Sequence, residues 1–239
     1  MSAGVNAMAA IFQGSAPRRG SGRFRMMLLA GLLACMSSGP LLAAAPSATG
    51  AHEAGTVAPA IDEGMILGDP ASPVGGNPKG DVTIVAFFDY NCPYCKKTDP
   101  VIEKLAKKDG NIRIIYKDLP ILAESSVYGA QLALAAKEQG KYAQARRALM
   151  GLPAGKSDEA AMRQALIRAG VNMKRLDKDL KARGPDIMAY LRRNLEHARS
   201  LGLQGVPVYL IGPYKVAAAL DEAGYAEVVK DARERAKGN

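Results

Sequence analysis

The residues of this chain best suited to chemistry are two cysteines, Cys92 and Cys95, in the run Cys92-Pro93-Tyr94-Cys95. Thiols at this spacing can exchange disulfides with a substrate, supply half of a zinc site, or form a permanent structural bridge. A bridge across so few residues closes a very small loop and constrains the unfolded chain little. A structural bridge is therefore less favoured than redox chemistry.

A zinc site would need two more ligands, and the rest of the sequence offers few. Beyond the first 45 residues there is no third cysteine, and the two histidines are His52 and His197. Neither histidine lies near the pair in the sequence. Disulfide exchange is therefore the predicted chemistry, and neither a metal nor another cofactor is expected.

The pair is predicted to lie between a buried strand and a helix, which is the context that redox chemistry requires. Residues 82–88, Val-Thr-Ile-Val-Ala-Phe-Phe, form a β-branched and aromatic run of strand length. Apolar residues between 101 and 106 then repeat at helical spacing, and Asp109-Gly110 ends the pattern. Both cysteines would then lie in the first turn of this helix.

This position predicts different roles for the two sulfurs. Cys92 meets the unpaired N–H groups and the positive dipole end of the helix, which stabilise its thiolate and lower its pKa. We therefore expect Cys92 to be the exposed, reactive sulfur. Pro93 suits the first turn because no backbone donor is needed there, and Cys95, one turn further in and partly buried, becomes the resolving thiol.

The remaining pattern predicts an α/β fold with the order β-α-β, a helical block, then β-β-α. A second buried strand is expected over residues 112–117, and every segment from about 125 to 201 has helical patterning. Two strands, 208–211 and 214–216, and a helix over 221–236 complete the order.

Within the helical block, capping residues and helix breakers predict where the helices begin. Ser125 or Ser126 is expected to cap the first helix, Ser157 the second and Asn172 the third. Gly184-Pro185 is expected to open the last one.

The first 45 residues are typical of an export signal and are set apart from the folded domain. Arg18 to Arg25 form a positive flank, Met26 to Cys35 an apolar run, and Ala43-Ala44-Ala45 a small-residue cleavage site. The run Leu32-Leu33-Ala34-Cys35 also resembles a lipoprotein processing box, which would leave Cys35 as a lipid-modified N-terminus. Both alternatives predict a protein of the periplasm or cell envelope.

A flexible tether is predicted over residues 46–75, which are rich in Ala, Gly and Pro and carry no sustained period. A short strand near Met65 to Leu67 is the one element expected within it. The folded domain is then expected over residues 76–239.

The charge of the chain argues against nucleic acid as a partner. The formal net charge is +9, and without Arg18, Arg19, Arg23 and Arg25 it is 28 basic against 23 acidic residues, or +5. No basic run carries interleaved aromatic residues, so a solvated, mildly basic surface is the better explanation.

A second motif, Gly205-Val206-Pro207-Val208, lies just before the strand expected at residue 208. A proline there can be an ordinary edge-strand proline, and only about 5–6% of X-Pro bonds in folded proteins are cis. The motif gains weight beside the Cys92–Cys95 pair, because a cis bond at Pro207 would place Val206 against the active-site disulfide. The Val206 backbone would then be free to pair with an extended substrate.

Three segments are specific enough to suggest a family. They are Gly76-Asn77-Pro78-Lys79-Gly80-Asp81-Val82-Thr83-Ile84-Val85, Phe87-Phe88-Asp89-Tyr90-Asn91-Cys92-Pro93-Tyr94-Cys95-Lys96 and Lys117-Asp118-Leu119-Pro120-Ile121-Leu122. Together they resemble the DsbA-like thioredoxin-fold proteins of bacterial envelopes, in the branch of ScsC and BdbD. The resemblance covers about residues 76–237 and implies a thioredoxin core with an inserted helical subdomain, a cis Pro207, and disulfide exchange on protein thiols.

The chain departs from this family in two ways that bear on mechanism. Relatives usually carry a buried glutamate six residues before the first cysteine, thought to relay protons to the resolving thiol, where this chain has Ala86. Asp89 is the nearest acid, but its odd offset from Ala86 predicts that it points to the other face of the strand. Tyr94 replaces the histidine of the strongest oxidants, which predicts a milder oxidant with a less depressed Cys92 pKa.

The leading hypothesis is an oxidase or general oxidoreductase that exchanges disulfides with cysteines of envelope or secreted proteins, and that a redox partner reoxidises or reduces. Isomerase or reductase activity is the alternative in the same class. Residues 46–80 are too short for the dimerisation domain of isomerases, which favours a monomer. Two other classes stay open: a copper-binding protein with paired thiolates holding Cu(I), and a peptide-binding chaperone that uses the groove near Pro207.

Overall fold

The computed structural model describes residues 62–155 and 157–238. The predicted export signal, Cys35 and the first part of the predicted tether lie outside these ranges. In chain order the elements are α2 (Glu63–Gly68), β1 (Val74–Gly76), β2 (Val82–Phe88), α3 (Pro93–Asp109), β3 (Ile112–Asp118), α4 (Glu124–Ala136), the 3₁₀ helix η1 (Lys137–Gln139), α5 (Tyr142–Met150), α6 (Glu159–Arg168), α7 (Met173–Ser200), β4 (Val208–Ile211), β5 (Tyr214–Val216) and α8 (Glu222–Lys237).

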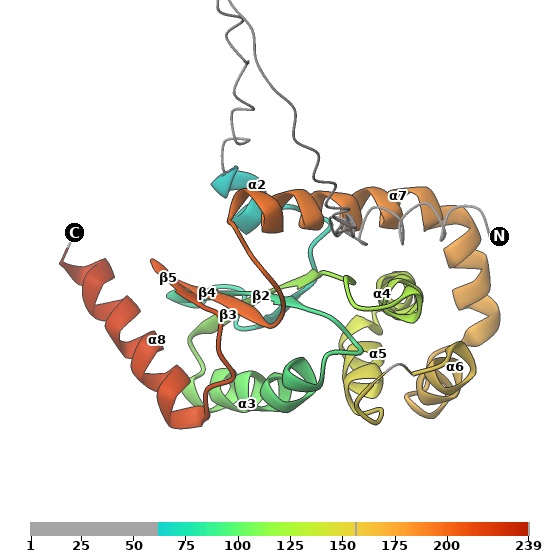
Figure 1. Cartoon of the computed structure of the whole chain (residues 1–239), viewed down its shortest axis with the longest axis horizontal. Helices are drawn as coiled ribbons and strands as arrows, with labels where there is room; N and C mark the ends of the chain where they lie inside the picture. Colours follow the sequence, from blue (N-terminus) through green and yellow to red (C-terminus); the bar gives the residue numbers. More distant parts are fainter. Residues whose placement is uncertain (1–61, 156, 239) are drawn as a thin grey trace, which may run out of the picture. The chain divides into compact units, whose positions relative to one another are not determined.

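The strands form one sheet in the order β1-β3-β2-β4-β5. Parallel pairing of β2 with β3 aligns Val82 with Ile112, and the other three pairings, β1 with β3, β2 with β4 and β4 with β5, are antiparallel. Helices α2 and α7 lie on one face of the sheet, and α3 and α8 lie on the other (Figure 1). The predicted order, β-α-β followed by helices and then β-β-α, is confirmed.

The central strand β2 is buried on both faces, which explains its continuous apolar run. Ile84, Ala86 and Phe88 join the larger apolar cluster, which includes residues of α3 and α8. Val85 and Phe87 join a second cluster with residues of α7. Because side chains alternate along a strand, one run of residues anchors helices on both sides of the sheet.

The helical block expected from residue 125 to 201 contains α4, α5, α6 and α7. Asn172 caps α7 as predicted, with its side chain accepting a hydrogen bond from the Arg175 amide. The prediction that Gly184-Pro185 opens a separate helix is wrong, because α7 continues through Pro185. Leu176 and Leu191, on either side of the proline, are fully buried, so packing of one long helix outweighs the roughly 3 kcal/mol cost of an interior proline.

The described residues include a helix and a strand on the N-terminal side of the predicted domain boundary at residue 76. The segment Met65 to Leu67 lies in a helix rather than the predicted strand, because the Asp62 side chain caps α2 by accepting from the Met65 amide. Ile66 is buried in the second apolar cluster, and the buried Asp69 carboxylate pairs with Arg193 at 3.1 Å.

The strand β1 also belongs to the sheet rather than to a tether. It pairs with β3, and Gly76 has a φ of 65°. A side chain at Gly76 would collide with the Ile112 carbonyl, so glycine permits this close approach. The glycines that suggested a flexible tether are therefore explained by a close-packed edge strand.

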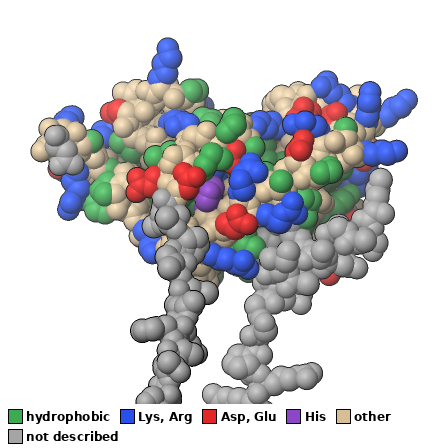
Figure 2. Space-filling view, turned by 90° about the horizontal axis from the view of Figure 1, so that it is seen from above, with side chains coloured by type: hydrophobic (Ala, Val, Ile, Leu, Met, Phe, Trp, Pro, Cys, Tyr) green, Lys and Arg blue, Asp and Glu red, His purple; other side chains and the backbone are tan. Residues whose placement is uncertain are grey.

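The face of the molecule seen in Figure 2 carries Lys and Arg side chains interspersed with Asp and Glu. On α7, Arg183 and Asp186 form an exposed ion pair at 3.0 Å. No helix within the described ranges combines the length and apolar character needed to span a membrane.

We predict that a chain beginning at Asp62 is more stable than one beginning at Gly76. The shorter chain loses the buried Ile66 side chain, worth about 2 kcal/mol, together with the Asp69 to Arg193 pair and most of β1. Urea unfolding of the two chains should give a lower midpoint for the shorter one. Equal midpoints would show that residues 62–75 do not contribute to folding stability.

Candidate active site

The two cysteines occupy the first turn of α3, as the sequence predicts. Cys92 is the N-cap residue, Pro93 is the first residue of the helix, and the Cys92 Sγ accepts a hydrogen bond from the Cys95 amide at 3.2 Å. Both thiols are free in this structure. A sulfur in this position receives backbone donors that the helix itself leaves unpaired.

The surroundings shift the two thiol pKa values in opposite directions. The pKa of Cys92 falls to about 7, chiefly because the Cys95 side chain hydrogen-bonds its thiolate, with the Cys95 and Tyr94 amides adding to the effect. Burial of Cys92 and the negative charge of Asp89 oppose this lowering. Burial raises the pKa of Cys95, and the hydrogen bond to Cys92 raises it further.

The prediction that Cys92 is exposed is wrong, since only 3% of its surface is accessible. The reason is the loop before β4, whose Val206 carbonyl lies 3.4 Å from the Cys92 Sγ. The Val206-Pro207 bond is cis, as predicted. The exposed side chain of this segment is Tyr94, at 63%.

Asp89 holds the loop between β2 and α3 in place. Its carboxylate accepts hydrogen bonds from the Asn91 amide and the Ser126 hydroxyl, both at 2.7 Å. It also accepts from the amides of Ile121 and Leu122 at 2.9 and 3.0 Å. Burial raises the Asp89 pKa, and these bonds oppose the rise. Sequence analysis treated Asp89 only as a misplaced acid and missed this role.

Asn91 links the same loop to the helical block. Its amide nitrogen donates to the hydroxyls of Ser125 and Ser126, and its oxygen accepts from the Ser157 backbone amide at 2.9 Å. The prediction that these serines cap helices is therefore wrong. No side chain caps α4, and Asp158 caps α6. The serines bind the active-site loop instead, which their local sequence does not reveal.

Lys96 ties the cysteine helix to the end of α5. Its Nζ donates to the carbonyls of Leu149 at 2.8 Å and Met150 at 3.4 Å. Burial lowers the Lys96 pKa to about 8, while the charges of Asp89 and both cysteines act to raise it. The lysine therefore brings a positive charge close to the redox pair, and sequence analysis did not select it.

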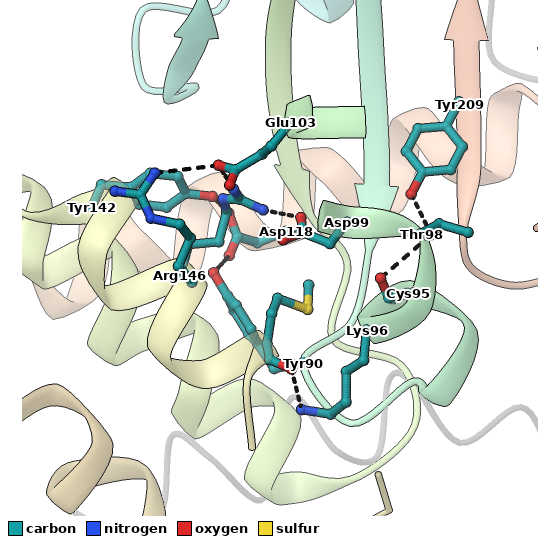
Figure 3. A network of polar contacts seen from close by, with 12 residues as sticks. Tyr90, Cys95, Lys96, Thr98, Asp99, Glu103, Asp118, Tyr142, Arg146 and Tyr209 are labelled. Atoms are coloured by element: carbon teal, nitrogen blue, oxygen red, sulfur yellow. Dashed lines mark hydrogen bonds and ion pairs between the residues drawn. The ribbon is translucent and has the colours of Figure 1, made fainter. Parts of the chain in front are cut away.

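A buried carboxylate lies at the end of β3, where α5 meets the sheet. Asp118 is 1% exposed and accepts hydrogen bonds from the hydroxyls of Tyr90 at 2.9 Å and Tyr142 at 3.0 Å (Figure 3). Burial raises the Asp118 pKa to about 7. Through Asp118, Tyr90 of the active-site loop is therefore connected to Tyr142 of the helical block.

Arg146 is fully buried beside this carboxylate network. It pairs with Asp99 and Glu103 of α3, and its guanidinium lies 4.2 Å from the centre of the Tyr116 ring. These two carboxylates compensate the buried charge of Arg146 and join α5 to α3.

Comparison with known proteins identifies the family. A protein-family model described as thioredoxin matches residues 68–231 of the chain. The chain belongs to the thioredoxin family. The predicted fold class is thereby confirmed, including the helices that separate β3 from β4.

Individual relatives narrow the resemblance within the family. The thiol:disulfide interchange protein DsbA of Burkholderia cepacia is 34% identical over 98 residues, which are 38% of this chain and 45% of that protein. The chain therefore matches less than half the length of this relative. A thioredoxin-like oxidoreductase from Silicibacter pomeroyi is 36% identical, with a TM-score of 0.68 over 72% of this chain and 98% of that one.

The catalytic domain of Proteus mirabilis ScsC is 30% identical, with a TM-score of 0.64, and the match covers 72% of this chain and 94% of that domain. The predicted resemblance to DsbA-like proteins such as ScsC is confirmed. Within the described ranges, no group of three or more His, Cys, Asp or Glu side chains is placed to hold a metal ion.

We predict that, of the two thiols of the reduced pair, only Cys92 reacts with iodoacetamide, with a rate that rises through a midpoint of about pH 7. The rate rises with pH because only the thiolate reacts. In the Cys95→Ala variant the midpoint should move up, since the strongest donor to the Cys92 thiolate is gone. The rate at each pH and mass spectrometry of the adduct provide the test. Preferential labelling of Cys95, or a midpoint unchanged in the variant, would contradict the assignment.

Proposed function

We propose that this chain is an exported thiol-disulfide oxidoreductase that exchanges disulfides with cysteines of envelope or secreted proteins. The observation that carries the proposal is the placement of the Cys92 sulfur. It lies at the N-terminus of α3, accepts an amide hydrogen bond there, has a lowered pKa, and faces the Val206 carbonyl. A thiolate stabilised in this way is both a nucleophile and a good leaving group.

The two sulfurs divide the reaction. In the oxidative direction a substrate thiolate attacks the Cys92 sulfur of the Cys92–Cys95 disulfide, Cys95 leaves, and the second substrate thiol then resolves the mixed disulfide. In the reverse direction the Cys92 thiolate attacks a substrate disulfide, and Cys95 releases the substrate by closing the pair. The raised pKa and complete burial of Cys95 support its assignment as the resolving thiol.

A groove beside the pair supports a peptide as substrate. It has a volume of about 540 Å³ and runs along Tyr94, the Val206-Pro207 segment and Ala217 to Ala219, with Lys215 as its charged residue. These largely apolar walls suit the exposed apolar side chains of an incompletely folded protein. The Val206 carbonyl, which accepts from the Cys92 thiol at 3.4 Å, loses that donor when the thiolate forms and can then accept from a substrate amide.

The leader supports the cellular location that we propose. The positive flank, apolar run and cleavage site of residues 18–45 favour export to the periplasm or envelope, with lipid attachment through Cys35 as the alternative. A monomer, and a redox partner that reoxidises or reduces the pair, remain predictions. Sedimentation tests the oligomeric state, and trapping in the producing cell tests for the redox partner.

We favour oxidase or general oxidoreductase activity over isomerase or reductase activity. The reduction potential measured against glutathione separates them, since a value of about −120 mV marks a strong oxidant and about −270 mV a reductant. Oxidation of a dithiol peptide tests the enzyme directly. An inert pair in both assays would favour the copper-binding or chaperone alternative.

Trapping experiments should distinguish the two cysteines. The Cys95→Ser variant can form the bond to substrate but cannot release it, so it should accumulate covalent complexes with envelope proteins that disappear on reduction. The Cys92→Ser variant lacks the stabilised thiolate and should trap far fewer. Non-reducing gels of both variants provide the comparison, with the double variant as background. Equal trapping by the two would overturn the division of roles.

A further inference from the structure

A second cavity lies beside the groove that flanks the redox pair. It has a volume of about 650 Å³ and opens on the face of the sheet that carries α2 and α7. Side chains of two strands, Val85 of β2 and Leu210 of β4, lie at its base. Leu67 of α2 and Leu201, the residue after α7, lie around it. The exchange between the two sulfurs does not use this cavity.

The cavity is present because the helices leave this part of the sheet uncovered. Helix α2 has six residues and lies beside the C-terminal end of α7, which ends at Ser200 (Figure 1). Leu210 is therefore only partly buried, and the Leu67 side chain is 45% exposed. Accessible apolar side chains around a concave surface are typical of a binding site.

The cavity and the groove are continuous. Lys215 lines both of them, and its Nζ donates to the Leu201 carbonyl at 3.2 Å, so this contact lies at their boundary. In the groove, Leu203 and Val206 pack against the second apolar cluster. In the cavity, Leu201 and Leu210 pack against the same cluster. An apolar surface therefore continues from Val206, beside the reactive sulfur, to the cavity.

The spacing along the chain indicates how far a substrate must extend to reach the cavity. The Val206 carbonyl lies 3.4 Å from the Cys92 Sγ, and Leu210 follows Val206 by four residues. Four residues of extended chain span at most about 14 Å. An extended substrate whose cysteine is bonded to Cys92 therefore covers the distance with about four or five of its own residues.

The lining indicates which kind of group fits the cavity. Ile66 and Val85 at the base are buried, whereas the charged residues Glu63 and Lys215 are exposed. An apolar side chain in the cavity would leave water and contact apolar atoms, while both charges stay solvated. Incompletely folded proteins expose such side chains, and folded proteins bury most of theirs.

We propose, as an extension that rests on the proposed function, that this cavity is a second substrate subsite. It takes an apolar side chain that lies about four to six residues from the attacked cysteine of an extended, incompletely folded protein. Contact there stabilises the encounter in which Cys92 attacks, so it raises the rate of mixed-disulfide formation. Substrates that have already folded keep such a side chain buried and lose this advantage.

The test uses peptides whose single cysteine is activated as a disulfide with thionitrobenzoate, and the full chain carries Cys35→Ser so that the pair supplies its thiols. The Cys92 thiolate attacks the peptide sulfur, the Cys92–peptide disulfide forms, and coloured thionitrobenzoate leaves as a thiolate. A leucine about five residues from the cysteine should raise the second-order rate constant about tenfold over the same peptide with serine there. Each side of the cysteine is tested in turn, and the gain is expected on one side.

Variants at Leu67 assign the gain to the cavity. Leu67→Glu places a charge in the wall, so the gain from the distant leucine should fall to about twofold or less. A gain from a leucine adjacent to the cysteine, which contacts the groove instead, should persist in this variant. Leu67→Met keeps the wall apolar and should keep the gain. These ratios compare two peptides on one protein, so a small change in stability cancels.

Ile167→Glu is the matched control. Ile167 on α6 is 49% exposed, as Leu67 nearly is, and it lines neither the groove nor the cavity. The gain from the distant leucine should be the same in Ile167→Glu as in the wild type.

The outcomes separate the subsite from the function on which it rests. If the unsubstituted pair releases no thionitrobenzoate even from a glutathione disulfide, the exchange activity is wrong and the subsite with it. Release from glutathione together with equal rates for the leucine and serine peptides would overturn the subsite alone. A gain that survives Leu67→Glu, or is lost equally in Ile167→Glu, would also overturn it. Self-association in sedimentation that Leu67→Glu abolishes would assign the cavity to a second copy of this chain instead.

Discussion

The active site depends on one constraint: the first turn of α3 must present its unpaired amides to the sulfur of Cys92 inside the protein. The short hydrogen-bonded loop between β2 and α3 holds the helix end in this position. Asp89 and Asn91 accept and donate bonds that join the end of β2 to the starts of α4 and α6. The helical block is therefore part of the support for the site, because it supplies the Ser126 hydroxyl that donates to Asp89 and the Ser157 amide that donates to Asn91.

The protein interior shifts the pKa values of the two thiols in opposite directions because hydrogen-bond donors are unevenly distributed around them. Cys92 gains the amide of Cys95 and the thiol hydrogen bond, and these outweigh its burial. Cys95 lies one turn deeper, where desolvation dominates. Burial alone would raise both pKa values, so the division of roles depends on hydrogen bonds at the helix end.

Sequence patterns predicted the sheet, the helix carrying the cysteines and the cis Pro207, because each depends on local periodicity or on a specific motif. The same patterns gave wrong predictions where contacts with residues distant in the sequence determine the local structure. The first serines of the helical block bind the loop of Asp89 and Asn91, Pro185 is held within α7 by packing on both sides, and Cys92 is covered by Val206 from the far end of the chain. No local pattern links Thr98 on α3 with Tyr209 on β4, whose hydroxyls lie 2.6 Å apart although the residues are 111 positions apart.

The sheet ends in two edge strands of three residues each, β1 and β5. Unfolded polypeptides that reach an exposed sheet edge can add to it as an extra strand and seed aggregates. A protein whose proposed substrates are incompletely folded meets such chains constantly. Edges this short, with two glycines on β1 and Lys215 at the centre of β5, offer little length for adventitious strand addition. Under the proposed function, a substrate protein then contacts the domain mainly at the Cys92 sulfur and its groove, and it can dissociate once its disulfide has been exchanged.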